Sequence, residues 1–174
     1  MDAEVAAQAG RHIGEHAAAH GLPSVNVVLH GGEPLLAGPR HLARLLDAVG
    51  AGVRDDTKVR FELQTHGTLL TETWLDVFER YEVTVGISPD GPAPANDRHR
   101  LPHRGRSSTG CAVRGVELLR TRPHLFVGLL AVIDLANDPV EVHDRLASFE
   151  PPVIDFGLPH ATHNDPPPPS TGCG

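Results

Sequence analysis

The residues best suited to chemistry lie in a turn that follows a short apolar run at residues 25–29. The turn reads His30-Gly31-Gly32-Glu33 and is followed by Pro34. Glycine has no Cβ, so two adjacent glycines let a ligand approach the backbone closely. Glu33 is held at the same place, and Pro34 stiffens the exit from the turn. The pattern indicates either a ligand-binding turn or a plain strand-to-helix turn, and only the rest of the chain decides between them.

Other polar residues occupy the same kind of position, just past the end of an apolar or alternating run. They are Thr65 and His66, Ser88 and Asp90, Asp134, and His160. The carboxyl ends of the strands carry the active site in β/α barrels, so we expect these side chains at one edge of a sheet. Each also has a plainer interpretation, because Ser88-Pro89 and Asp90-Gly91 are common turn pairs and His66 could cap a strand.

Helix and strand patterns alternate along the chain. The runs that predict strands are residues 25–29, 59–64, 83–87, 126–133 and 153–156. Helix patterns begin near residues 2, 39, 71, 108 and 138, the third capped by Thr71 and the last by Asp138. In the first helix the apolar residues Val5, Ala9, Ile13 and Ala17 predict the buried face.

Five strands separated by helices predict repeated βαβ units and therefore a parallel sheet. Five are too few for a closed eight-stranded barrel, so we expect an open, partial (β/α) barrel with helices on its outer face. Residues 1–163 would form this domain. Residues 164–174 include four consecutive prolines and no periodicity, which predicts a disordered tail.

Composition excludes several classes of function. The formal net charge of −7 over 174 residues argues against a nucleic acid or an anionic membrane as the main partner. The sequence contains neither an apolar run of the roughly 18 residues needed to span a bilayer nor a signal-peptide pattern at residues 1–20. Its two cysteines lie far apart and form no disulfide framework, which predicts a cytoplasmic protein.

Three segments together carry a resemblance to a known family. They are the segment at residues 30–35, the segment Gln64-Thr65-His66-Gly67-Thr68 with two leucines after it, and residues 86–92 with Asn96-Asp97-Arg98-His99-Arg100 beyond them. In order and spacing they resemble the strand-end motifs of radical SAM enzymes. The nearest branch is the radical SAM/SPASM peptide maturases, which are relatives of the anaerobic sulfatase-maturating enzymes. Within that branch the chain resembles cyclophane-forming enzymes that act on peptides with an FxSxx carboxyl terminus.

The resemblance implies a site for S-adenosylmethionine (SAM). Gly31, Gly32 and Glu33, next to His30, would receive the ammonium group of SAM. Ser88 matches a serine that contacts SAM, and Arg100 matches an arginine that pairs with its carboxylate. Leu158 falls where an apolar residue contacts the adenine, while His66 and Asp90 would line the substrate cavity.

The implied activity is cleavage of SAM to a 5′-deoxyadenosyl radical, followed by hydrogen abstraction from a side chain of a ribosomal precursor peptide. That reaction requires a [4Fe-4S] cluster, which the family holds with three cysteines of a CxxxCxxC loop. This sequence lacks the motif, since Cys111 is isolated and Cys173 lies in the tail. We therefore expect a fragment or a decayed relative that is inactive alone, with the missing loop upstream of Met1 and the SPASM extension also absent.

Two other functions remain open from the residues alone. His30, His66, Asp134 and His160 could bind Zn²⁺ in a metal-dependent hydrolase, with Glu33 as the general base. Their spacing fits no metalloprotease motif, and isolated strand-end histidines are more often structural. The second alternative is a non-catalytic peptide-binding fragment that uses an open sheet edge and the Arg/His-rich loop.

Overall fold

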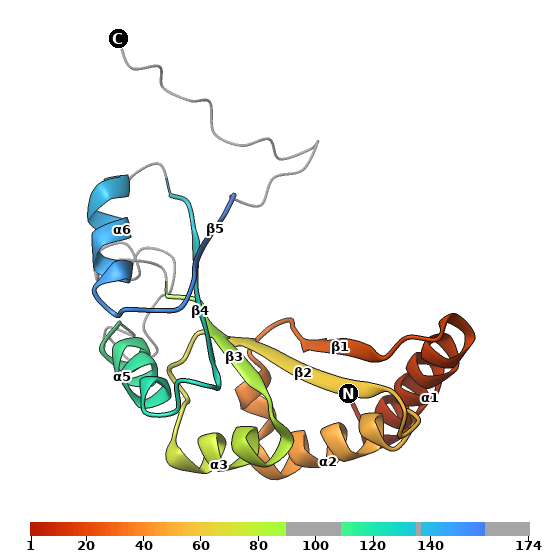
Figure 1. The fold of residues 1–174 in the computed structure, drawn as a ribbon. Helices are drawn as coiled ribbons and strands as arrows, with labels where there is room; N and C mark the ends of the chain where they lie inside the picture. Colours follow the sequence, from red (N-terminus) through yellow and green to blue (C-terminus); the bar gives the residue numbers. More distant parts are fainter. Residues whose placement is uncertain (90–108, 135–136, 159–174) are drawn as a thin grey trace, which may run out of the picture.

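The computed structural model describes residues 1–89, 109–134 and 137–158, which form one curved sheet with helices along its outer side (Figure 1). The strands are β1 (Ser24–Leu29), β2 (Lys58–Thr65), β3 (Thr84–Ile87), β4 (Phe126–Val132) and β5 (Ile154–Gly157). The helices are α1 (Ala3–His20), η1 (Pro34–Ala37), α2 (Pro39–Gly50), α3 (Glu72–Tyr81), α5 (Thr109–Arg120) and α6 (Pro139–Ala147).

The five strands follow their order in the sequence, and every neighbouring pair is parallel. A helix connects strand to strand on the same side each time, so the sheet curls into an open half-barrel (Figure 1). The predicted α/β fold class, a partial and open (β/α) barrel, is confirmed. The carboxyl ends of β1, β2 and β3 consequently meet at one edge of the sheet.

The hydrophobic core lies between the outer face of the sheet and the helices. Alternate residues of the strands point into it, among them Phe61, Leu63, Val85, Ile87 and Leu129, all buried. The helices contribute Leu46, Trp74, Phe78, Val116 and Leu146. Because this packing uses only one face of the sheet, the other face is left for polar residues such as Gln64 and Ser88.

The first helix buries only part of the predicted stripe, since Ala17 is buried and Ile13 packs against the core. The buried residues of α1 are Ala6, Gly10, Gly14 and Ala17, whereas Val5 is exposed. A Cβ at Gly10 would collide with the backbone of Val49, and one at Gly14 would collide with Gly52. Close contact between two backbones outweighs the burial of one larger side chain, so the apolar pattern missed the two glycines and wrongly included Val5.

Two of the predicted helix caps differ in their chemistry. Asp138 accepts hydrogen bonds from the backbone N–H groups of Val140 and Glu141, as its sequence position predicts. Thr71 occupies the N-cap position of α3 but makes no side-chain cap bond. The short helix η1 was not predicted, and its N-cap is Glu33.

Several predicted residues fall outside the part of the chain that the structure describes. They are Asp90, Arg100, His160, Cys173 and the proline-rich tail. Within the described ranges, none of the helices combines the length and the apolarity that crossing a membrane requires.

Candidate functional site

A hollow of about 480 Å³ lies at the carboxyl ends of β1, β2 and β3. Its lining residues come from all three strand ends and from β4: His30, Gly31, Gly32, Glu33, Gln64, Thr65, His66, Ser88 and Leu130. The expectation that strand-end polar residues gather at one edge is therefore confirmed for His30, Glu33, Thr65, His66 and Ser88. This strand-end pocket is the candidate site.

The two glycines of the turn adopt backbone conformations that side chains disfavour. Gly31 has φ +96° and Gly32 has φ +53°, and a Cβ at either position would meet no atom within 4 Å. The space in front of this turn is therefore open. The exposed backbone of the turn offers carbonyl acceptors to a ligand in the pocket.

Glu33 lies at the base of the same turn, but its carboxylate is occupied by protein groups. Oε1 accepts hydrogen bonds from the Leu35 N–H at 3.0 Å and the Thr65 hydroxyl at 2.7 Å. Oε2 accepts from the backbone N–H of His66 at 3.0 Å and lies 3.1 Å from its Nε2. A carboxylate offers about four lone-pair positions, so these four contacts account for its capacity. Glu33, whose side chain is 7 % exposed, ties the end of β1 to the end of β2.

The His66 ring is fixed by contacts on both of its nitrogens. Nδ1 accepts from the backbone N–H of Thr68 at 3.2 Å and lies 2.9 Å from the Thr68 hydroxyl. Because Nδ1 is an acceptor, a neutral ring carries its hydrogen on Nε2, which faces Glu33. His66 therefore lines the pocket and, through its contacts with Glu33, helps to connect the end of β1 to the end of β2.

Gln64 and Ser88 connect the next pair of strand ends. The side-chain amide of Gln64 donates a hydrogen bond to the Ser88 hydroxyl oxygen at 2.6 Å. The backbone N–H of Ser88 donates to the Thr65 carbonyl at 2.8 Å. Sequence reasoning gave neither Gln64 nor Leu130 a role at this site. Gln64 could have been predicted from its position, because it lies on the polar side of an alternating strand and directly precedes the strand-end residues Thr65 and His66.

The remaining predicted site residues do not join the pocket within the described structure. Leu158 lies one residue beyond β5, is 80 % exposed, and does not line the strand-end pocket. Asp90 and Arg100 lie outside the described residues. The roles given to these three residues stay predictions.

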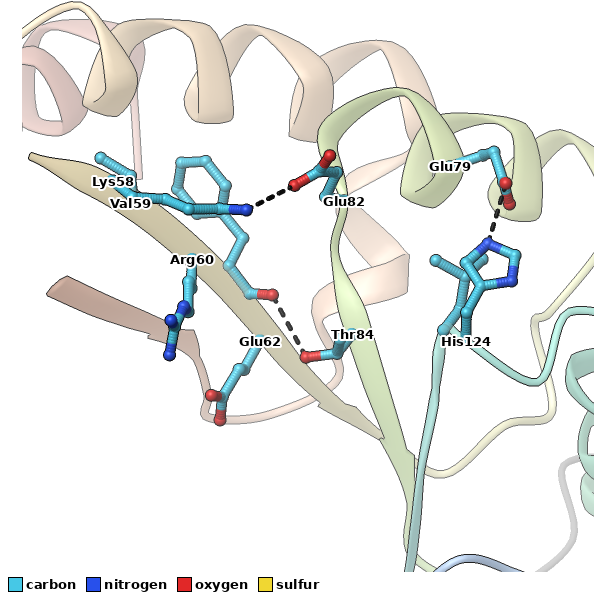
Figure 2. Close-up of a pocket in the computed structure, with 10 residues that line it drawn as sticks. Lys58, Val59, Arg60, Glu62, Glu79, Glu82, Thr84 and His124 are labelled. Atoms are coloured by element: carbon cyan, nitrogen blue, oxygen red, sulfur yellow. Dashed lines mark hydrogen bonds and ion pairs between the residues drawn. The ribbon is translucent and has the colours of Figure 1, made fainter. Parts of the chain in front are cut away.

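A second hollow of similar size lies at the opposite, amino-terminal ends of β2, β3 and β4 (Figure 2). Two pairs of its residues lie within ion-pair distance, Lys58–Glu82 at 3.2 Å and His124–Glu79 at 2.8 Å. The Thr84 hydroxyl donates to the Phe61 carbonyl where β2 and β3 diverge. Paired charges at the amino-terminal end of such strands indicate a structural role.

The described residues among the proposed zinc ligands do not come together. His30 and His66 line the strand-end pocket, but Asp134 lines a different hollow together with Phe156. The Asp134 carboxylate accepts a hydrogen bond there from the side-chain amide of Asn137. Among the described ranges, no group of three or more His, Cys, Asp or Glu side chains is arranged to hold a metal ion. His160 lies outside these ranges. The geometry gives no support to the hydrolase alternative.

Comparison with known proteins places these features in context. No protein-family model matches the chain. The chain is 33 % identical over 138 residues to a serine-type anaerobic sulfatase-maturating enzyme of Klebsiella aerogenes, covering 78 % of this chain. It is 32 % identical over 90 residues to a cysteine-type enzyme of Clostridium perfringens, covering 52 % of this chain and 24 % of the relative.

The chain is homologous to part of the anaerobic sulfatase-maturating enzymes. It spans about a third of the length of the Klebsiella relatives, 34 % and 35 %. The solved structure of native anSMEcpe with bound AdoMet has the same fold, with a TM-score of 0.77 and 24 % identity. That match covers 89 % of this chain and 42 % of anSMEcpe. The structure of the same enzyme with AdoMet and the Kp18Cys peptide matches with a TM-score of 0.74.

An iron–sulfur cluster does not fit the residues of this chain. A CxxxCxxC site requires three thiolates, and the sequence contains two cysteines. Cys111 lies on α5, half-buried, with its sulfur 3.0 Å from the guanidinium of Arg114, and Cys173 lies outside the described residues. By contrast, the open glycine turn and the hydroxyl of Ser88 fit a ligand of the size and polarity of SAM.

Proposed function

We propose that the strand-end pocket binds SAM and that the chain is the SAM-facing part of a radical SAM enzyme that modifies a peptide. The observation that carries this proposal is the convergence of the glycine turn, Gln64 and Ser88 around one hollow of about 480 Å³. That volume lies within the usual range for small-molecule sites. The homology to the sulfatase-maturating enzymes supports the same conclusion.

Each part of the pocket has a proposed partner on SAM. The carbonyl groups of Gly31 and Gly32 accept from the ammonium group, while Glu33 holds the turn in place from below. The hydroxyl of Ser88 contacts the ligand from the adjacent strand end. Arg100 pairs with the carboxylate, and Leu158 packs against the adenine, as the family resemblance implies.

The chemistry assigned to bound SAM is that of a precursor of the 5′-deoxyadenosyl radical. Reductive cleavage depends on a cluster that two cysteines do not hold, so these 174 residues contribute binding and orientation. We propose a ribosomal precursor peptide with an FxSxx carboxyl terminus as the substrate, with His66 and Asp90 lining the cavity that receives it and His30 on the SAM side of the pocket. The separated cysteines fit a reducing, cytoplasmic setting.

Two asparagine variants test the SAM site with matched backbones. Gly32 (φ +53°) and Gly21 (φ +59°) are both left-handed, and both have open space where a Cβ would lie. Asparagine is one of the few residues that tolerate this conformation. Gly32→Asn places a side chain in the pocket, whereas Gly21→Asn places the same side chain at the end of α1.

Binding of SAM to the purified chain is then measured by isothermal titration calorimetry. The proposal predicts that the wild type and Gly21→Asn bind SAM equally, and that Gly32→Asn binds at least about tenfold more weakly, a loss of about 1.4 kcal/mol. A wild-type chain that does not bind SAM, or equal affinities in both variants, would overturn the assignment.

The peptide partner is tested separately by fluorescence anisotropy. A labelled peptide ending in FxSxx should bind the chain more tightly than a scrambled peptide of the same composition, and SAM should alter its affinity. Peptide binding that SAM leaves unchanged would instead favour a peptide-binding module without SAM chemistry.

A further inference from the structure

Gln64 makes a contact that the proposed function does not by itself require. Its amide crosses from β2 to β3 and donates to the hydroxyl oxygen of Ser88 at 2.6 Å. Both side chains line the strand-end pocket, and neither belongs to the hydrophobic core. The bond therefore joins two polar groups inside the candidate site.

Gly86 makes room for this contact. It pairs with Gln64 in the parallel register, and a Cβ on Gly86 would collide with the Gln64 amide oxygen and crowd the amide carbon. The amide thus occupies the space beside a bare glycine and reaches Ser88, which lies two residues after Gly86 and directly past the end of β3. Any larger residue at position 86 would occupy the space that the amide uses.

Ser88 is consequently held from β2 at two points. The Thr65 carbonyl accepts its backbone N–H at 2.8 Å, and Gln64 donates to its side-chain oxygen. A serine side chain has three staggered rotamers available to it. The Gln64 bond selects the rotamer whose oxygen faces β2, and it makes that oxygen an acceptor on this side.

We infer that Gln64 is a positioning residue for SAM binding, which acts by fixing the rotamer of Ser88 and depends on the bare backbone of Gly86. The inference rests on the proposed function, because it concerns how Ser88 meets SAM. The position of the Ser88 hydroxyl is set before the ligand arrives, so binding does not have to order this side chain.

A double-mutant cycle measures this role. Gln64→Met keeps the length of the side chain and removes the hydrogen bond, and Ser88→Ala removes the group that is positioned. SAM affinity should fall about fivefold for Gln64→Met in the wild-type background, which corresponds to about 1 kcal/mol, the usual contribution of one hydrogen bond. In the Ser88→Ala background the same change should alter affinity by less than about twofold.

Gly86→Ala provides an independent test in which neither Gln64 nor Ser88 is mutated. Its Cβ displaces the Gln64 amide, so SAM affinity should fall as in Gln64→Met. Gly50→Ala on α2 is the control, because a Cβ there meets no atom within 4 Å and the residue lies away from the pocket. This control should bind SAM as the wild type does.

The outcomes separate this inference from the proposed function. If the wild type does not bind SAM, the proposed function and this inference both fail. If it binds SAM but the Gln64 and Ser88 effects add independently, or Gly86→Ala binds normally, only the positioning role fails. Urea unfolding of each variant distinguishes lost affinity from lost stability.

The side-chain amide signal of Gln64 in ¹H–¹⁵N spectra should shift in both Gly86→Ala and Ser88→Ala, and an unshifted signal would contradict the hydrogen bond between Gln64 and Ser88.

Discussion

Glu33 shows how one residue can be recognised in the sequence and still have a different task in the structure. Its position in the glycine turn indicates a ligand-binding carboxylate. The structure instead directs both oxygens toward the end of β2, where Thr65 and His66 approach within 3.1 Å. Its contribution to a ligand site is then to hold the turn, whose backbone carbonyls remain available.

Glu33→Gln should therefore lower the stability of the chain. In Glu33 both carboxylate oxygens accept hydrogen bonds from protein donors, whereas glutamine has one oxygen and one NH₂ group, which can only donate. The NH₂ group of the variant would therefore face a protein donor in a nearly buried position, at a cost of about 1–3 kcal/mol in the free energy of unfolding. Urea denaturation measures this change.

Glu82→Gln is the control for this measurement. Glu82 pairs with Lys58 at the surface, and the side chain is 78 % exposed. Removal of its charge should change the free energy of unfolding by less than about 1 kcal/mol. Equal effects at positions 33 and 82 would contradict the link between β1 and β2.

Tyr81 gives a pH-dependent prediction, and it is the only tyrosine in the sequence. Burial raises the pKa of its hydroxyl, and the hydrogen bond to Asp47 at 2.9 Å raises that pKa further. Because the folded state holds this proton more tightly than the unfolded state does, the protonated hydroxyl contributes to the free energy of unfolding at neutral pH. This contribution is lost as the pH rises through the raised pKa of Tyr81.

The titration of Tyr81 can be followed by its ultraviolet absorbance. Asp47→Asn removes the nearby negative charge, so the pKa of Tyr81 should fall toward its ordinary value. Identical midpoints in the wild type and this variant would contradict the proposed coupling between α2 and α3.

At the scale of elements, β2 is the strand that organises the site. Its last residues reach β1 through Glu33 and β3 through Ser88, so the distance between the two neighbouring strand ends depends on it. The outer layer has a similarly close contact where α1 meets the end of α2. There, Gly10 and Gly14 let the two backbones touch.

Gly10→Ala should destabilise the protein, although alanine is normally the better helix former. Its Cβ would collide with the backbone of Val49, which forces the two helices apart at a cost of about 1–3 kcal/mol. Gly50→Ala on α2 is the matched control, since a Cβ there meets no atom within 4 Å. Thermal unfolding should show a lower midpoint for Gly10→Ala alone, and equal midpoints would contradict the packing of α1 on α2.

The sequence predicted the elements well, because strand alternation and helix caps are local signals. It also placed His30, Glu33, His66 and Ser88 at strand ends, which the parallel topology brings together. It could not predict that Gln64 would reach Ser88, because that contact depends on the spacing of two strands and on the bare Gly86. Gly10 and Gly14 on the buried face of α1 were missed for a related reason, since glycine packing leaves no apolar pattern to detect.

At the scale of the whole molecule, β1 and β5 are the outer strands of the curved sheet. The β5 side also presents exposed apolar residues, including Val153, Phe156 and Leu158. A strand edge with apolar neighbours is a template for pairing with another chain. We therefore expect this edge to dominate the self-association of the chain.

Phe156→Lys should reduce this association by placing a charge beside the edge. Sedimentation velocity should show an average mass that rises with concentration in the wild type and rises less in the variant. Val5→Lys alters an exposed valine on α1, away from the edge, and should leave the association unchanged. If Val5→Lys and Phe156→Lys behave alike, the β5 edge is not the contact.

If three strand ends form one SAM site, an NMR titration of the ¹⁵N-labelled chain with SAM will locate it. The largest backbone and side-chain shifts should occur at Gly31, Gly32, Gln64 and Ser88. Residues around the opposite hollow, such as Lys58 and Thr84, should be unaffected (Figure 2). Shifts centred on that hollow, or no shifts at millimolar SAM, would contradict a SAM site at these strand ends.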